Sequence, residues 1–170
     1  MSSLRKKERI LGVDPGFGRT GFGIIEGDRN EWKLVCYGCI ETTAIDSFID
    51  RIEQLHTQLT QIIKKFRPTQ AAVEDLFFYK NVTTAMKVGQ ARGVILLTLR
   101  QANIPVFECT PLQVKQSLTG YGRAEKGQIQ KMVQMILKIK KKISPDDAAD
   151  ALAIALTAGA TLRVHKKVSS

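Results

Sequence analysis

The hydrophobic period of this chain first changes near Asp46, and that change most constrains its fold. Before it, short apolar runs separated by turn residues predict three strands in meander order, at residues 10–14, 20–26 and 32–42. After it, apolar residues recur every three or four positions, which predicts an amphipathic helix that ends before Pro68. The chain therefore starts as an antiparallel sheet and continues with helices.

Strands and helices alternate beyond that first helix. The apolar pattern predicts strands at residues 71–77 and 104–109, and helices at 81–102, 111–120, 124–138 and 144–162. Written without the short helices, the order is βββαβαβα, which indicates an α/β class fold: one five-stranded mixed sheet flanked by helices. We expect a basic N-terminal extension at 1–9, a single domain at 10–162 and a basic C-terminal tail at 163–170.

The chain of 170 residues is basic, with a formal net charge of +10. The excess is local, because residues 10–109 carry equal numbers of acidic and basic side chains, whereas residues 110–142 carry eight basic residues against Glu125 alone. Such a segment favours a polyanionic partner, and nucleic acid first. A solvated basic face remains the alternative.

Other partners are less well supported. The longest apolar stretch, Val94 to Leu99, is far too short to span a bilayer, so no membrane partner is expected. Residues 1–9 are charged, with no apolar segment typical of a secretory signal behind them. Three cysteines do not make a disulfide scaffold, which indicates a reducing, cytoplasmic location.

Four carboxylates stand in apolar surroundings. Asp14 ends the first strand and Glu74 lies inside the fourth, where an acid is costly unless it is paired or bound to a metal. Asp147 and Asp150 are three residues apart on a helix that is otherwise Ala, Leu and Ile, so they share one face. The alternative for Asp147 is a helix-capping role with Ser144.

Metal-assisted phosphoryl transfer is the chemistry that uses such a set. Converging carboxylates repel one another, and without a cation at least one of them would take up a proton. Hard ions such as Mg²⁺ or Mn²⁺ prefer oxygen ligands, and the chain has no His or Cys cluster suited to zinc. Two such ions about 4 Å apart activate a water and stabilise the leaving oxygen.

At this point the sequence resembles a known family. The RuvC family of Holliday-junction resolvases has similar motifs, in this order and at matching spacing, to Leu11-Gly12-Val13-Asp14-Pro15-Gly16, Val73-Glu74-Asp75-Leu76-Phe77, Gly89-Gln90-Ala91-Arg92-Gly93 and Asp147-Ala148-Ala149-Asp150-Ala151-Leu152-Ala153-Ile154-Ala155. The resemblance runs from about Ile10 to Thr157 and implies an RNase H-like fold.

The resemblance also implies the roles of individual residues. It makes Asp14, Glu74, Asp147 and Asp150 the catalytic and metal-binding set, with two Mg²⁺ per subunit and Mn²⁺ as a substitute. Helix spacing alone does not choose between Asp146 and Asp147 as the partner of Asp150, whereas the Asp-Ala-Ala-Asp pattern chooses Asp147.

Three further residues match the family pattern. Lys115 and Lys126 correspond to lysines that act near the scissile phosphate, although position alone would make them two exposed lysines among eight basic residues. Phe77 corresponds to an aromatic that reaches into the DNA junction, which requires the fourth strand to have ended before it.

The resemblance implies a structure-selective endonuclease that nicks two strands of like polarity at a four-way junction and leaves 5′-phosphate and 3′-hydroxyl ends. Its partners would be the junction DNA, a second copy of the chain and the RuvA–RuvB branch-migration complex. Two matched nicks need two sites related by a two-fold axis, and the apolar helix from Val82 to Ala102 is the expected homodimer interface. A helix buried wholly within its own monomer is the alternative.

Three other classes of protein share some of these features. An RNase H-like nuclease of the YqgF type would act on RNA, and cleavage of both substrates would distinguish it. A non-catalytic basic DNA-binding module explains the charge but not four placed carboxylates. An actin-like ATPase uses a similar acid–glycine hairpin but needs a second such domain, for which 170 residues leave no room.

Overall fold

The computed structural model describes the chain except residues 1–6, 29–30, 76–81 and 166–170, and except the side chains of 162–165. Its centre is one five-stranded sheet in the order β3-β2-β1-β4-β5. The first three strands pair antiparallel, and β4 and β5 are added parallel to β1. This confirms the predicted mixed sheet, whose strands are β1 (Glu8–Asp14), β2 (Arg19–Gly27), β3 (Trp32–Glu41), β4 (Gln70–Glu74) and β5 (Val106–Cys109).

Some strand ends differ from the sequence prediction. The fourth strand was expected to reach Phe77 but ends at Glu74, after which the backbone N–H of Asp75 donates to the carbonyl of Cys109 at 2.7 Å. The fifth strand begins at Val106 rather than at residue 104, because Pro105 has no N–H to donate to a ladder. The first strand starts earlier than expected, at Glu8.

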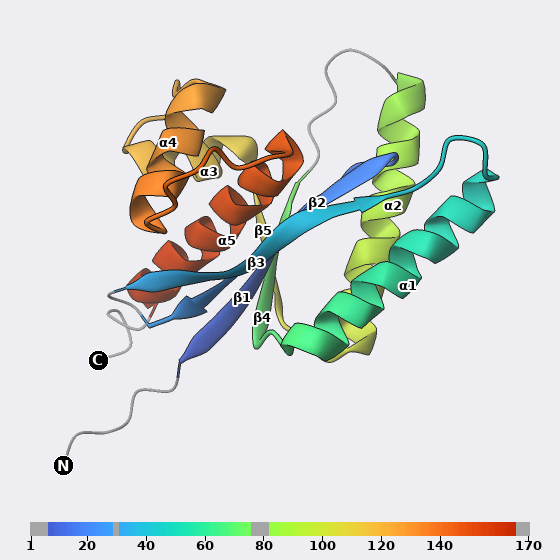
Figure 1. Cartoon of the computed structure of the whole chain (residues 1–170), viewed down its shortest axis with the longest axis horizontal. Coiled ribbons are helices and arrows are strands. Elements are labelled where there is room, and N and C mark those ends of the chain that lie inside the picture. The colour runs from blue at the N-terminus through green and yellow to red at the C-terminus, as the bar shows by residue number, and fades with distance from the viewer. Residues whose placement is uncertain (1–6, 29–30, 76–81, 166–170) are drawn as a thin grey trace.

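Helices cover both faces of the sheet (Figure 1). On one face lie α1 (Phe48–Phe66) and α2 (Val82–Gln101), and on the other α5 (Asp146–His165) lies against the strands, with α3 (Pro111–Thr119) and α4 (Lys126–Ile136) outside it. The helix α5 extends beyond the predicted end at residue 162. Within the described ranges, no helix is both long and apolar enough to cross a membrane.

Strand parity divides the core into two halves. Leu11 and Val13 of β1 pack with α1 and α2, whereas Ile10 packs with α5. Successive residues of a strand face opposite sides, so Gly12 and Asp14 share the α5 side with Ile10. By the same rule Ala72 and Glu74 of β4 face α5. The sheet therefore presents two acids to the same helix.

Glycines let α5 approach the sheet very closely. A Cβ added at Gly12 would lie 2.0 Å from the carbonyl oxygen of Ala151, and one added at Gly21 would lie 2.0 Å from that of Asp147. Strand residues with side chains would push the helix away, because interiors are packed at close to crystal density. The small residues of α5 complete this fit, since its alanines from Ala148 to Ala158 are buried.

The helix α2 is buried on one side only. Its inner side chains belong to the α1 half of the core and are Ala91, Ile95, Thr98 and Leu99. Large apolar side chains lie on the outside, with exposed fractions of 75% for Val82, 63% for Met86 and 56% for Leu97. The expectation that this helix is apolar on more than one face therefore agrees with the structure.

Candidate active site

Two of the predicted acids lie at the ends of adjacent parallel strands. Val13 of β1 and Val73 of β4 are register partners, so Asp14 and Glu74 follow them side by side at the same end of the sheet. Both side chains are directed to the α5 face by strand parity. Because β4 ends at Glu74, its carboxylate lies at the rim of the sheet.

The first turns of α5 bring the other two acids to this place. Asp147 lies over Gly21, the register partner of Asp14, because Gly21 has no side chain to hold the helix off. One helical turn further, Asp150 faces the same region, as the predicted three-residue spacing requires. The packing of a helix on glycines therefore assembles acids that are far apart in the sequence.

The electrostatics show that the acids interact. Burial, together with the neighbouring charges of Glu74, Asp150 and Asp147, raises the pKa of Asp14 to about 8. Burial and the charge of Asp150 raise the pKa of Glu74 to about 7. Burial also raises the pKa of Asp150, although the ammonium of Lys126 opposes that shift. Such a site favours a bound cation.

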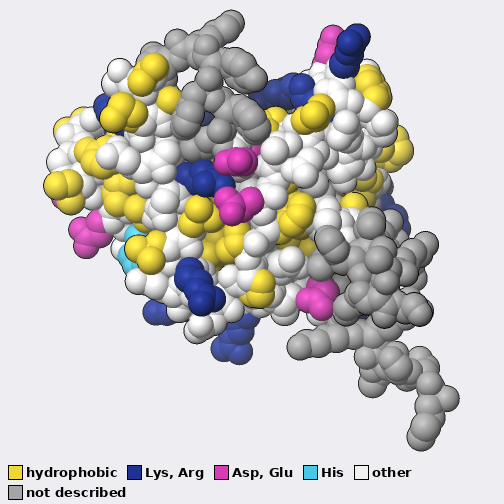
Figure 2. Space-filling model, turned by 180° about the vertical axis from the view of Figure 1, so that it is seen from behind, with side chains coloured by type: hydrophobic (Ala, Val, Ile, Leu, Met, Phe, Trp, Pro, Cys, Tyr) yellow, Lys and Arg dark blue, Asp and Glu magenta, His cyan; other side chains and the backbone are white. Residues whose placement is uncertain are grey.

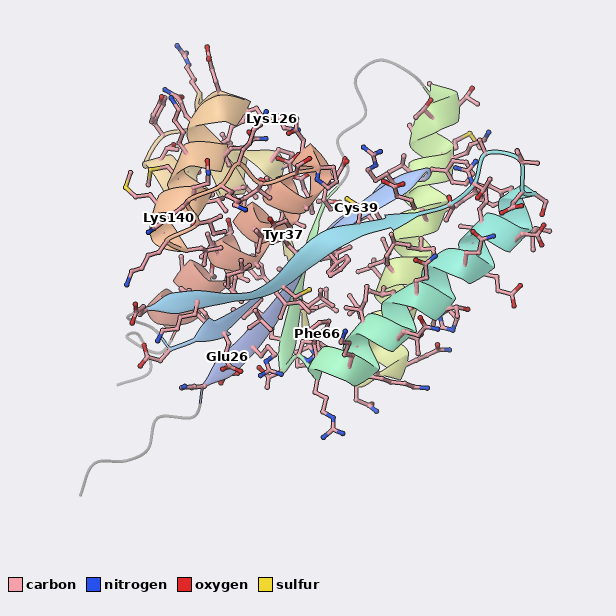
Figure 3. All side chains as sticks on the ribbon, viewed as in Figure 1. Glu26, Tyr37, Cys39, Phe66, Lys126 and Lys140 are labelled. Atoms are coloured by element: carbon pink, nitrogen blue, oxygen red, sulfur yellow. The ribbon has the colours of Figure 1, made fainter. Side chains whose placement is uncertain are left out.

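Lys126 meets the acids from α4. Its Nζ donates to Oδ2 of Asp150 at 2.8 Å and lies 3.8 Å from Oδ2 of Asp146. Lys126, labelled in Figure 3, stands beside the first turn of α5. A cavity of about 220 Å³ opens next to this pair, with Glu74, Asp150, Lys115 and Lys126 among its lining residues and an apolar floor of Pro111, Val114, Ile129 and Ala153. Both predicted lysines therefore lie beside the acids.

The four acids have the donor chemistry of a site for a divalent metal ion. Their donor chemistry fits a hard divalent cation, because four carboxylates supply oxygen ligands and their mutual repulsion is relieved by positive charge. In the part of the chain that the structure describes, however, no three Asp, Glu, His or Cys side chains already form a metal-holding group. Two of the acids face basic side chains instead, Asp150 with Lys126 and Asp147 with Arg19 at 3.6 Å.

The structure separates Asp147 from Asp146. Asp147 raises the pKa of Asp14, so its charge acts on the centre of the site. The side chain of Asp146 is 56% exposed and accepts a hydrogen bond from Nε2 of Gln130 at 3.2 Å. This arrangement supports Asp147 rather than Asp146 as a member of the acidic set.

Two arginines at the site were not singled out from the sequence. Arg19, at the start of β2, pairs with Glu41 of β3 at 3.0 Å as well as with Asp147. Arg92 of α2 donates from Nε to the backbone carbonyl of Glu74 at 3.1 Å. A signal for Arg92 existed, since it lies in the motif Gly89-Gln90-Ala91-Arg92-Gly93, but the motif alone does not tell which strand the side chain would reach.

The remaining basic residues give a more mixed surface than their number suggests. Lys138 pairs with Glu31 at 2.7 Å, whereas Lys140 stands at the outer edge of the α4 side of the molecule (Figure 3). Seen from behind, basic and acidic side chains lie close together near the middle of the surface (Figure 2). Phe77 lies outside the described residues, and the structure gives only the end of β4 at Glu74 before it.

The fold and the site together define a class. A five-stranded mixed sheet in the order β3-β2-β1-β4-β5, helices on both faces and acids at the ends of the central strands are the features of an RNase H-like protein. The predicted fold class is therefore confirmed.

Comparison with known proteins gives the family. The family model described as "Crossover junction endodeoxyribonuclease RuvC" matches residues 10–158. The curated RuvC of Petrotoga mobilis is 51% identical over 92% of this chain and 96% of its own length, and that of Halothermothrix orenii is 49% identical over 93% and 96%. A solved structure of T. thermophilus RuvC in complex with a Holliday junction substrate is 34% identical, with a TM-score of 0.89 over 93% of this chain and 96% of that one. The chain belongs to the RuvC family of crossover junction endodeoxyribonucleases.

Proposed function

We propose that this chain is a structure-selective endonuclease that resolves Holliday junctions in recombinational DNA repair by paired, metal-dependent nicks in two strands of like polarity. The products carry 5′-phosphate and 3′-hydroxyl ends. The observation that supports this most is the electrostatic coupling of Asp14, Glu74, Asp147 and Asp150 at one end of the sheet, in a chain of this family.

The metal-binding set of this proposal is Asp14, Glu74, Asp147 and Asp150. The family is one of divalent-metal-dependent nucleases, and we propose two Mg²⁺ ions per subunit, with Mn²⁺ as a substitute. When bound, the ions supply an activated water and charge stabilisation at the leaving oxygen. The chain's own acids hold the ions, and their raised pKa values return toward the ordinary range when positive charge arrives.

The lysines have a different task in this proposal. Lys115 and Lys126 line the cavity beside Glu74 and Asp150, where a scissile phosphate adds negative charge. Lys126, which pairs with Asp150, would move its ammonium toward that phosphate and so stabilise the charge that develops during cleavage. Phe77 is proposed, by family resemblance only, to contact a base of the junction.

A homodimer gives the two matched sites that paired nicks require. Support comes from the outer face of α2, where Val82, Met86, Gly93 and Leu97 follow one another at spacings of four, seven and four residues. This set is called the α2 stripe below. A Cβ at Gly93 would meet nothing within 4 Å, so the stripe is open for a second helix to approach. In the dimer, the α2 stripes of the two subunits would pack against each other across the two-fold axis.

Two further parts of the proposal rest on the family resemblance. We infer that the RuvA–RuvB branch-migration complex is the protein partner, and that the protein works in the cytoplasm, where its DNA substrate lies. Neither inference depends on the geometry of the acidic site. Co-purification with the complex on junction DNA would test the first one independently.

One assay tests the proposed function. A synthetic four-way junction, a linear duplex and an RNA duplex of matched sequence are incubated with the protein in Mg²⁺ and in chelator. We expect paired nicks in the junction alone, and only with Mg²⁺. Cleavage of the RNA in preference to the junction, or binding without metal-dependent nicking, would contradict the proposal.

A further inference from the structure

The side chain of Arg92 is mostly buried, at the back of the acidic site. Only 15% of its side chain is exposed, and a buried guanidinium requires partners for its charge and its donors. Those partners come from two strands: Nε donates to the Glu74 carbonyl at 3.1 Å, while Nη2 pairs with Glu108 and lies 3.4 Å from Oδ1 of Asp75. One side chain of α2 therefore joins the ends of β4 and β5.

The side chain and the main chain of Glu74 therefore make contacts on opposite sides of the sheet. Its carboxylate points to the α5 side with Asp14, and its main chain is bound from the α2 side by Arg92. The bond lies where β4 ends. The pairing with β1 stops at Val73, so the sheet holds Glu74 from the β5 side only, through Cys109. Without Arg92, the position of the Glu74 carboxylate would depend on strand pairing alone.

We propose that Arg92 is a positioning residue for metal binding: it fixes the backbone of Glu74 so that the carboxylate stays directed at Asp14. This inference rests on the proposed metal-dependent function and adds to it a residue that does not touch the substrate or the ion. Partners outside the ligand set commonly change metal affinity by about 10–100-fold when they are removed.

The test compares Arg92→Gln with Arg100→Gln. Arg100 is exposed in the last turn of the same helix, so this matched control removes the same charge without touching the end of β4. Isothermal titration with Mn²⁺ in the absence of DNA measures metal affinity directly. Fluorescence anisotropy in chelator measures junction binding, and circular dichroism reports folding.

We expect Arg92→Gln to weaken Mn²⁺ binding about tenfold or more and to leave junction affinity within about twofold, with Arg100→Gln unchanged. Arg92→Lys keeps the charge but cannot reach the carbonyl and both acids with one planar group, so it should recover only part of the affinity. Wild-type Mn²⁺ affinity in a folded Arg92→Gln variant would overturn the proposal, as would equal losses in Arg92→Gln and Arg100→Gln.

A second variant keeps the test decisive if Arg92→Gln does not fold. Glu108→Gln alters a half-exposed partner, leaves Arg92 in place and should weaken Mn²⁺ binding roughly threefold. Unchanged affinity in this variant would then overturn the inference. Failure of the wild-type protein to nick any junction would instead overturn the proposed function, because the Mn²⁺ titration does not depend on nicking.

Discussion

The helices α5 and α2 are both 20 residues long and largely apolar, yet the fold uses them in opposite ways. The helix α5 lies between the sheet and α3–α4, and its residues from Ala151 to Gly159 are all buried (Figure 1). The helix α2 buries one face and leaves the α2 stripe in solvent. Burial of the body of α5 fixes the two acids in its first turns at the end of the sheet, whereas the bare face of α2 leaves a surface on which another molecule can dock.

The glycines of the two helix environments show the same contrast. Gly21 on the sheet faces the α5 backbone at a distance that no side chain fits, whereas Gly93 on α2 faces open space. We therefore expect a side chain added at Gly21 to destabilise the fold and one added at Gly93 to be tolerated.

Lys126→Ala breaks the link between α4 and the acid end of α5. Its loss should lower the single-turnover rate of junction nicking about 10²-fold if, as proposed, Lys126 is a charged donor to the reacting phosphate. Lys141→Ala, at an exposed lysine away from this pair, should leave the rate near that of the wild type and flatten the salt dependence of binding by about one unit of slope. Equal rate effects in both variants would reduce Lys126 to part of a general basic surface.

Met86→Glu and Leu97→Glu place charges on the bare face of α2. The monomer should remain folded, because neither side chain belongs to the core. Sedimentation at micromolar concentration should give about the 18.9 kDa chain mass for the variants and twice that for the wild type. Leu112→Glu, at an exposed leucine on α3, is the matched control and should stay dimeric. A wild-type protein that sediments as a monomer would exclude the dimer.

Gly21→Ala tests the close approach of α5. The added Cβ would overlap the Asp147 carbonyl, so we expect a loss of about 3 kcal/mol in the free energy of unfolding, measured by urea denaturation. Gly93→Ala makes the same substitution at a glycine that faces open space. With nothing near its Cβ, it should be neutral or stabilise the monomer by up to about 1 kcal/mol. Equal destabilisation by both substitutions would contradict the difference in packing between Gly21 and Gly93.

The stability of the metal-free protein should depend on pH through Asp14. Its pKa rises from 3.8 to about 8 on folding, so between these values the folded chain holds a proton that the unfolded chain has lost. The contribution to stability is therefore complete below about pH 4 and is lost as the pH rises through about 8. Asp14→Asn should remove the part of the slope that Asp14 causes and be more stable than the wild type at pH 8. Parallel pH–stability curves for the wild type and Asp14→Asn would contradict this role of Asp14.

Much of this fold follows from local patterns. The strands and helices were predictable because the apolar periods of two and 3.6 residues persist along each element. Strand parity also puts Asp14 on the same face as Ile10 and Gly12. The end of β4 at Glu74 was not predictable, because apolar residues resume at Leu76, Phe77 and Phe78 after Glu74 and Asp75, with no Gly, Pro or Asn between them to signal a turn.

The candidate site was predictable in part. The four acids stood out because charge in apolar surroundings is rare, and the family motifs chose among them. The arginines did not stand out, because the role of Arg92 depends on strands β4 and β5 meeting beside α2 and that of Arg19 on α5 lying against β2. Contacts of this kind depend on tertiary packing, which no local period encodes.

The helix α5 brings Asp147 close to Asp14, and substitutions at the two neighbouring acids Asp146 and Asp147 test this placement. Single-turnover nicking of a four-way junction in Mg²⁺ is compared for Asp147→Asn and Asp146→Asn, which differ by one helix position. We expect the first to lower the rate by about 10³-fold and the second to leave it near wild type, because only Asp147 acts on Asp14. Full activity in Asp147→Asn, with the loss in Asp146→Asn, would contradict the account.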